Sequence, residues 1–442
     1  MNYRLLFIIS IIFLYSCQSK KAEEWTPLFN GKDLSGWKSN EHDDSFQVVD
    51  GMLVATGERS HLFYVGEDGD ASFTNFELKA EIMTTYTANS GIYFHTQWQD
   101  EGWPGTGYEA QVNSTHKGAG DYKEVKKTAS LYGIRNVYKA LSQDSVWFEM
   151  RVRVEGKKVN IWINDIMTVD YLEPENSEKS LLTGGTFALQ CHDPESKVVY
   201  KSILIKELPA PDEQNVPEEE AFPEILRLQA NHFPVMDMAI DPINEPTIDN
   251  ALQTFYSTGI NLGFLSDSES SMESILANKP VFIGMKILLG DSFSGQVDDL
   301  KNIDYTVGQI PSFTDADVLN IDEFMKIHIA NANAYLVTSP VDIIFNATLL
   351  PAQLMEGYRE IWTLERMKEL SGILKEHNVA IGIDCKSKYP DLNFIKVAKE
   401  QGCTFSFYNL LDTEGNANID YLLEAVEYAG LDYKDVFIPG NM

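Results

Sequence analysis

The sequence predicts two domains of different class: an all-β sandwich or jelly roll over residues 25–208, and an α/β barrel or parallel sheet over residues 222–442. In the first half, short segments alternate apolar and polar residues and lack helical periodicity. In the second half, short apolar segments alternate with longer helical runs. A length of 442 residues agrees with two or three domains.

The alternating segments of the first half are typical of strands that bury one face. Clear examples are residues 76–82, 147–154 and 159–163. Turn-forming Gly, Asn and Asp residues separate these segments. Many short strands without intervening helices predict a sandwich or jelly roll.

The second half begins after a linker at residues 209–221, where prolines and acidic residues favour an extended spacer. A helix is expected over residues 363–375, with Thr363 as its N-cap and Asn378 beyond its end. The expected strands are apolar and precede helical runs, which predicts a parallel sheet or barrel. They are residues 235–240, 261–265, 281–287, 341–345, 379–384 and 404–408.

The N-terminus has the features of a secretion signal. Residues 1–16 contain Arg4 followed by a short apolar stretch that is too short to span a bilayer. The stretch ends in Leu-Tyr-Ser-Cys17, which resembles the lipobox of bacterial lipoproteins. The resemblance implies acylation of Cys17, a polar tether at residues 17–24, and a protein attached to a membrane of the cell envelope by its lipid. The alternative is a plain signal peptide with an incidental cysteine.

The composition limits the partners. The formal net charge is −31, which argues against a nucleic-acid-binding surface because such a surface needs clustered Lys and Arg. Beyond Cys17 only Cys191, Cys385 and Cys403 remain, and this odd, sparse set predicts buried thiols and no disulfide framework.

Four motifs in the first half occur in a distinctive order: LFNGKDLSGW at 28–37, NSGIYF at 89–94, GYEAQ at 107–111 and FALQCH at 187–192. Together they closely resemble the 3-keto-disaccharide hydrolase family. The resemblance implies a concanavalin-like sandwich that cleaves glycosides already oxidised to a ketone at sugar C3.

The same motifs, taken as strands, would place polar groups on common faces because side chains alternate along a strand. Glu109 and His192 are the expected catalytic acid and base. A divalent cation could be held by these same two residues, although two scattered ligands are a weak signal. The expected substrate-binding residues are Asn89, Tyr93, His95, Trp98, Trp103, Gln111, Gln190 and Lys201.

A ketone at C3 makes the hydrogen on C2 acidic, so a base can remove it and the C1 substituent can leave by elimination. Addition of water then gives net hydrolysis. This route needs a base near C2 and an acid at the leaving group, and it does not need the paired carboxylates of ordinary glycosidases. One departure from the family pattern is Lys201, where an Arg-Asn pair is expected after the aromatic Tyr200.

The second half resembles the polymerase and histidinol phosphatase (PHP) family at residues 234–241, 341–351, 362–366 and 379–384. The resemblance implies a distorted (β/α)7 barrel with metal ligands at the strand ends. Most of the matching ligand positions hold other residues, with Ala239 and Asn346 in place of histidines. We therefore expect a catalytically degenerate, accessory barrel. Two alternatives stay open, a non-catalytic carbohydrate-binding lipoprotein and a phosphoesterase that acts through the barrel.

Overall fold

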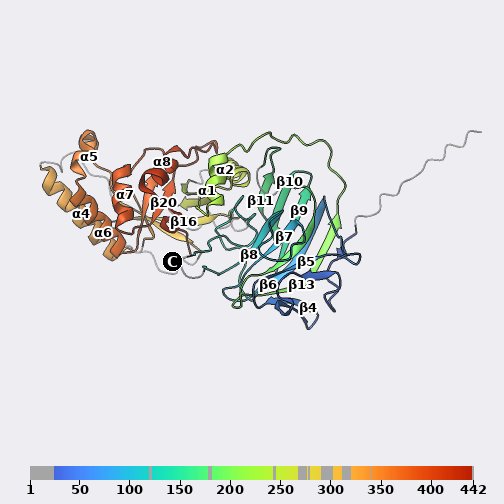
Figure 1. Ribbon diagram of the computed structural model, residues 1–442. Coiled ribbons are helices and arrows are strands. Elements are labelled where there is room, and N and C mark those ends of the chain that lie inside the picture. Colours follow the sequence, from blue (N-terminus) through green and yellow to red (C-terminus); the bar gives the residue numbers. More distant parts are fainter. Residues whose placement is uncertain are drawn as a thin grey trace, which may run out of the picture.

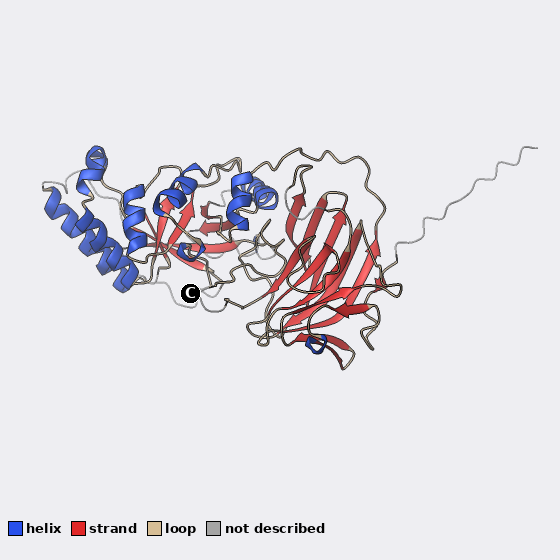
Figure 2. Cartoon of the chain, viewed as in Figure 1, coloured by secondary structure: helices blue, strands red, loops and turns tan. Residues whose placement is uncertain are grey.

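The computed structural model describes residues 24–118, 122–177, 182–241, 245–266, 276, 279–289, 302–310, 320–339 and 341–440. A β-sandwich and an α/β domain lie side by side and are joined by an extended segment (Figures 1 and 2). The predicted lipidation site, Cys17, lies outside the described residues. Within those residues no helix combines the length and apolar character needed to cross a membrane.

The first domain consists of two antiparallel sheets. One has the order β11-β10-β9-β6-β13-β4-β3, with β1 pairing with β13, and the other has the order β2-β5-β12-β7-β8. The antiparallel sandwich predicted from alternation is thus confirmed. Its strands are β1 (Thr26–Pro27), β2 (Trp37–Ser39), β3 (Phe46–Val49), β4 (Met52–Thr56), β5 (Ser60–Tyr64), β6 (Phe76–Thr84), β7 (Asn89–Thr96), β8 (Tyr108–Asn113), β9 (Phe148–Glu155), β10 (Lys158–Ile163), β11 (Ile166–Leu172), β12 (Thr186–Cys191) and β13 (Lys197–Glu207).

Alternation decides which side chains fill the space between the sheets. In β7 and β8, Ile92, Phe94, Ala110 and Val112 join the core that both sheets share. The residues between them, such as Tyr93, therefore point to the outer face of the second sheet. This outer face carries the polar residues of the family motifs.

The second domain is built around parallel strands in chain order, from β14 to β20. The first and last strands, β14 and β20, lie close together, so the described strands form a nearly closed barrel. Tyr305 is fully buried and donates a hydrogen bond to the Met238 carbonyl oxygen at 2.9 Å. A side chain at Gly263 would overlap its hydroxyl group, and one at Gly284 would overlap its ring. The barrel interior here is therefore packed with side chains.

The strands of this domain are β14 (Met236–Ile240), β15 (Asn261–Ser266), β16 (Phe282–Leu288), β17 (Tyr305–Gln309), β18 (Ile343–Phe345), β19 (Ala380–Asp384) and β20 (Phe405–Tyr408). Its helices are α1 (Pro223–Ala230), α2 (Glu245–Thr258), α4 (Ile321–Thr338), α5 (Tyr358–Ile361), α6 (Leu364–Glu376), α7 (Leu392–Glu400) and α8 (Asp420–Ala429). The predicted helix is α6, where the Thr363 hydroxyl accepts a hydrogen bond from the Arg366 amide and Asn378 adopts a left-handed conformation.

The two domains are docked through a segment of the first domain at residues 122–139. Val125, Val137 and Tyr138 from this segment belong to the hydrophobic core of the second domain. Polar contacts reinforce the packing: the Asn261 side chain donates to the Asn136 carbonyl oxygen at 2.7 Å and accepts from the Tyr138 amide at 3.1 Å. One wall of the first domain is thus held in place by the second.

Candidate functional site

A cavity of about 590 Å³ lies on the outer face of the second sheet, a size that suits a disaccharide-sized ligand. Its floor comes from β12, β7 and β8, which are neighbours in the sheet. Both expected catalytic residues, Glu109 and His192, line it. The lining residues are Asn89, Tyr93, Trp103, Pro104, Gly107, Tyr108, Glu109, Gln111, Tyr122, Glu124, Tyr132, Gln190, His192 and His232.

Glu109 projects from β8 across the neighbouring strand β7. Its Oε1 accepts a hydrogen bond from the Gln190 side chain at 3.1 Å. Glu109 pairs with Tyr93 in the sheet, and its carboxyl group lies over Gly91, where any Cβ would overlap it. The glycine of the NSGIYF motif therefore makes room for the carboxyl group.

Burial raises the pKa of Glu109 to about 8, and this effect outweighs the opposing hydrogen bond from Tyr93. The side chain is consequently protonated near neutral pH. A protonated carboxyl group that opens onto a cavity can donate a proton to a leaving group, which is the role of a general acid.

Two amide side chains in the cavity wall have unused hydrogen-bonding capacity. Gln111 donates to the Asn89 side chain at 2.7 Å, and Gln190 donates to the Tyr93 hydroxyl at 3.2 Å. In the described part of the chain, neither Gln111 Oε1 nor Gln190 Oε1 has a hydrogen-bond partner, although both are buried. Because buried acceptors are normally paired, these oxygens fit a ligand that brings hydroxyl donors.

His192 follows the last residue of β12, and its ring forms a pair with the next residue. His192 Nδ1 lies 2.6 Å from Asp193 Oδ2. When the carboxylate accepts from Nδ1, the neutral ring has its lone pair on Nε2, which suits a general base. Asp193 keeps a pKa below its ordinary value: burial would raise it, but hydrogen bonds from His192 and Ser196 more than offset this.

An aromatic wall closes one side of the cavity. The Trp103 ring lies against His192, with ring centroids 5.4 Å apart, and against His61 at the same separation. Partly exposed aromatic rings of this kind are common surfaces for contact with the apolar face of a sugar ring.

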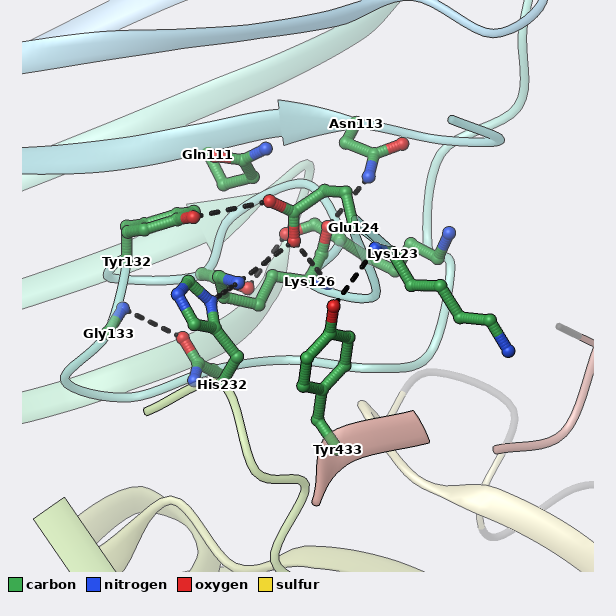
Figure 3. Close-up of polar contacts among 12 residues, drawn as sticks. Gln111, Asn113, Lys123, Glu124, Lys126, Tyr132, Gly133, His232 and Tyr433 are labelled. Atoms are coloured by element: carbon green, nitrogen blue, oxygen red, sulfur yellow. Dashed lines mark hydrogen bonds and ion pairs between the residues drawn. The ribbon is translucent and has the colours of Figure 1, made fainter. Parts of the chain in front are cut away.

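A second polar cluster forms the opposite wall. Residues 128–132 run along the free edge of β8, with the Tyr132 amide donating to the Glu109 carbonyl oxygen at 2.9 Å. The Glu124 carboxylate accepts from Lys126 Nζ at 3.0 Å and from the Tyr132 hydroxyl (Figure 3). It also accepts from the Tyr122 hydroxyl. Burial would raise the pKa of Glu124, but the Lys126 ammonium and these hydrogen bonds hold it below its ordinary value.

This second cluster was not predicted from the sequence. The polar residues of the cluster occur at every second position, at Tyr122, Glu124 and Lys126, and Val125 between them is a core residue. This spacing of two could have indicated that the three polar side chains share one face. His232 was also missed as a site residue, because it belongs to the second domain and only the docking of the domains brings it to the cavity.

Three residues expected to bind substrate lie elsewhere. His95 adopts a left-handed conformation where the pairing of β12 with β7 is irregular, so it leaves the expected face, packs on Phe76 and bonds to the Thr74 carbonyl oxygen at 3.0 Å. Lys201 lies on β13 in the other sheet and pairs with Glu81 at 2.7 Å.

Trp98 is the third of these residues. Its ring packs against Phe63 on the same outer face but does not line the cavity, and the Lys38 ammonium lies 3.9 Å from its centre.

The donor set does not fit a metal centre. Glu109 accepts a hydrogen bond from Gln190 and is protonated near neutral pH, which makes it a weak ligand. His192 Nδ1 is paired with Asp193, and the one remaining ring nitrogen, Nε2, does not make a metal centre by itself. Across the described residues, no three His, Cys, Asp or Glu side chains gather around one point. We therefore assign Glu109 and His192 proton-transfer roles and derive no step through a cation.

Two acidic residues of the barrel accept hydrogen bonds from backbone amides. Asp237 is buried in β14 and accepts hydrogen bonds from the amides of Leu411 and Ala239, at 2.8 and 3.3 Å. Asp384 accepts from the amides of Lys386 and Ser387. The resemblance to PHP phosphoesterases remains a prediction.

Three solved structures illustrate what part of this chain is similar to. A candidate glycosyl hydrolase from Parabacteroides distasonis is 26% identical, covering 43% of this chain and 97% of its own, with a TM-score of 0.37. A second from the same organism is 22% identical, covering 42% and 100%, with a TM-score of 0.34. A carbohydrate-binding module from Bacillus subtilis is 15% identical, covering 39% and 96%, with a TM-score of 0.29.

No curated protein matches the chain. The family comparison agrees with the motifs of the first domain. Residues 24–206 match the model of the 3-keto-alpha-glucoside-1,2-lyase-like domain, so it is this family that the sandwich domain resembles.

Proposed function

We propose that the first domain cleaves glycosides that carry a ketone at C3, by elimination followed by hydration. The observation that carries the proposal is the convergence of Glu109 and His192, which is paired with Asp193, on one cavity. Beside them lie two buried amide oxygens that have no partner among the described residues. The family match over residues 24–206 gives the same chemical class.

The proposed reaction begins at C2. His192 Nε2 takes the acidic proton from C2, the C1–C2 double bond forms, and the bond between C1 and the leaving oxygen breaks. Glu109, protonated near neutral pH, gives its proton to that oxygen. Water then adds across the double bond: Glu109 takes a proton from the water as its oxygen bonds to C1, and His192, whose N–H has exchanged with solvent, gives a proton to C2. This completes a net hydrolysis and returns both residues to their starting forms.

Binding is assigned to the polar and aromatic wall. Gln111 Oε1 and Gln190 Oε1 would accept hydrogen bonds from sugar hydroxyls, Tyr93 and Asn89 hold these amides in place, and Trp103 would contact the ring. A protein that only binds sugars could use the same wall, so turnover decides between the two functions.

The test incubates the protein with a 3-keto-α-glucoside in deuterium oxide and follows the products by mass spectrometry. We expect sugar release with one deuterium at C2, and a loss of about 100-fold or more in Glu109→Gln. Cleavage without deuterium at C2 would contradict the elimination route. Binding without cleavage would favour the sugar-binding function. A parallel run with a chelator tests the assignment of proton-transfer roles.

A further inference from the structure

His232 lies in the second domain, between α1 and β14, yet it lines the cavity of the first (Figure 3). Its Nδ1 lies 2.7 Å from Lys126 Nζ, across the boundary between the domains. The ring also packs edge-on against Tyr122 and Tyr132, which line the same cavity. A residue of the barrel domain is therefore part of the candidate site.

The position of His232 is fixed by the docking of the domains. Gln229, three residues earlier, accepts from the Asn136 amide at 2.8 Å. On the other side of the ring, Tyr433 accepts a hydrogen bond from the Lys123 amide at 3.3 Å (Figure 3). His232 itself has φ of 67°, a left-handed conformation that is uncommon outside glycine and that the surrounding packing must maintain.

The contact with Lys126 determines where the imidazole carries its proton. Lys126 is fully buried and paired with the Glu124 carboxylate, and an ammonium has only donors. His232 Nδ1 must then accept, so the ring is neutral and its hydrogen is on Nε2. Among the described residues, Nε2 has no partner of its own.

We infer that the barrel domain completes the sugar site, with His232 Nε2–H as a hydrogen-bond donor to an oxygen of the bound sugar and Lys126 as the residue that fixes its tautomer. This inference rests on the proposed function for the identity of the sugar. It gives the second domain a direct part in binding, in addition to its packing against residues 122–139.

Two amide substitutions test the roles of the two ring nitrogens separately. In His232→Asn, the short amide can still accept from Lys126 and tolerates a left-handed backbone, but nothing replaces Nε2–H. In His232→Gln, the longer amide places an N–H near the former Nε2. The control is His377→Ala, a histidine of the same domain that bonds to Asn333 and does not line the cavity.

We expect the KM for a 3-keto-α-glucoside to rise about tenfold in His232→Asn, with melting temperature unchanged. His232→Gln should recover most of the affinity, and His377→Ala should match the unmodified protein. An unchanged KM in His232→Asn would overturn the inference. Equal losses in the Asn and Gln variants, both folded, would also overturn it, since the donor would not be the important group.

A second measurement does not depend on turnover. In protein labelled with 15N-histidine, correlation spectra report which ring nitrogen of His232 carries hydrogen, and we expect Nε2. A proton on Nδ1 would refute the tautomer assignment. If the protein does not cleave any 3-keto-α-glucoside, the proposed function fails. The spectra and the binding of the unoxidised α-glucoside to the two variants then still test the role of His232.

Discussion

The outer face of the second sheet and the barrel both contain acidic residues, but these residues have different hydrogen-bond partners in the two regions. On the sheet, Glu109 is bonded by side chains, and its neighbours Gln111 and Gln190 keep unpaired oxygens within the described structure. In the barrel, Asp237 accepts hydrogen bonds from the backbone amides of Leu411 and Ala239, and Asp384 accepts from two backbone amides and from the Asn409 side chain.

The difference shows that the hydrogen-bond partners of the acidic residues distinguish the two regions better than residue type does. Buried polar atoms are expensive to leave unpaired, so a chain retains them where a ligand supplies the missing partner. Carboxylates that accept from backbone amides serve to fix loops. The following predictions test this distinction.

The largest effect is expected from Gly91→Ala. The added methyl group would overlap the Glu109 carboxyl group, so the acid must move away from the cavity. We expect turnover of a 3-keto-α-glucoside to fall by about 100-fold or more. Gly372→Ala is the matched control, because Gly372 lies in α6 with open space around it. Retention of activity in Gly91→Ala would show that Glu109 need not lie over β7.

The pH dependence tests the protonation state of Glu109. Its pKa of about 8 lies above the ordinary value because the side chain is buried, so the acid form dominates below pH 8 and disappears above it. If the acid form is required, kcat/KM falls about tenfold per pH unit above that point. Glu109→Gln should show low activity without this alkaline limb. An alkaline limb that persists in Glu109→Gln would assign it to another group.

The next effect concerns the His192–Asp193 pair. In Asp193→Asn, the amide can no longer favour the His192 tautomer with its lone pair on Nε2. Loss of a hydrogen bond to a charged group corresponds to about 1.5–3 kcal/mol, or roughly a 10- to 100-fold lower rate. Asp165→Asn, on the turn between β10 and β11, serves as the control. Equal rates in the two variants would exclude Asp193 from the mechanism.

The opposite pattern is expected in the barrel. Asp237→Asn replaces an acceptor of two backbone amides with a group that also carries N–H, so we expect the free energy of unfolding to fall by about 1–3 kcal/mol. Urea denaturation measures this change. Turnover by the folded fraction should stay within about twofold of the unmodified protein. A specific loss of turnover would mean that the barrel around Asp237 takes part in the reaction.

Much of the fold followed from short-range patterns. Alternation of apolar and polar residues predicted the sandwich, and strand–helix alternation predicted the parallel strands of the second domain. The same alternation placed Glu109, Gln111 and Gln190 on one face, and the cavity contains all three.

The positions of the other site residues depend on contacts between distant segments of the chain, and these contacts cannot be predicted from a single sequence. His95 departs from its face because of an irregular strand pairing, and His232 reaches the cavity only through docking of the two domains. Asp193 was not singled out from the sequence, although it directly follows His192 and accepts its hydrogen bond. The missed residues depend on geometry that spacing alone does not encode.

The smallest effect is expected at Lys201, which the family pattern suggested as a binding residue. Because β13 belongs to the other sheet and its lysine pairs with Glu81 on an exposed surface, Lys201→Ala should change neither KM nor kcat. The lost ion pair should lower stability by less than about 1 kcal/mol, as is usual for exposed pairs. If Lys201→Ala instead weakened substrate affinity tenfold, the sugar would have to contact both sheets, and the outer face of the second sheet would not contain the whole site.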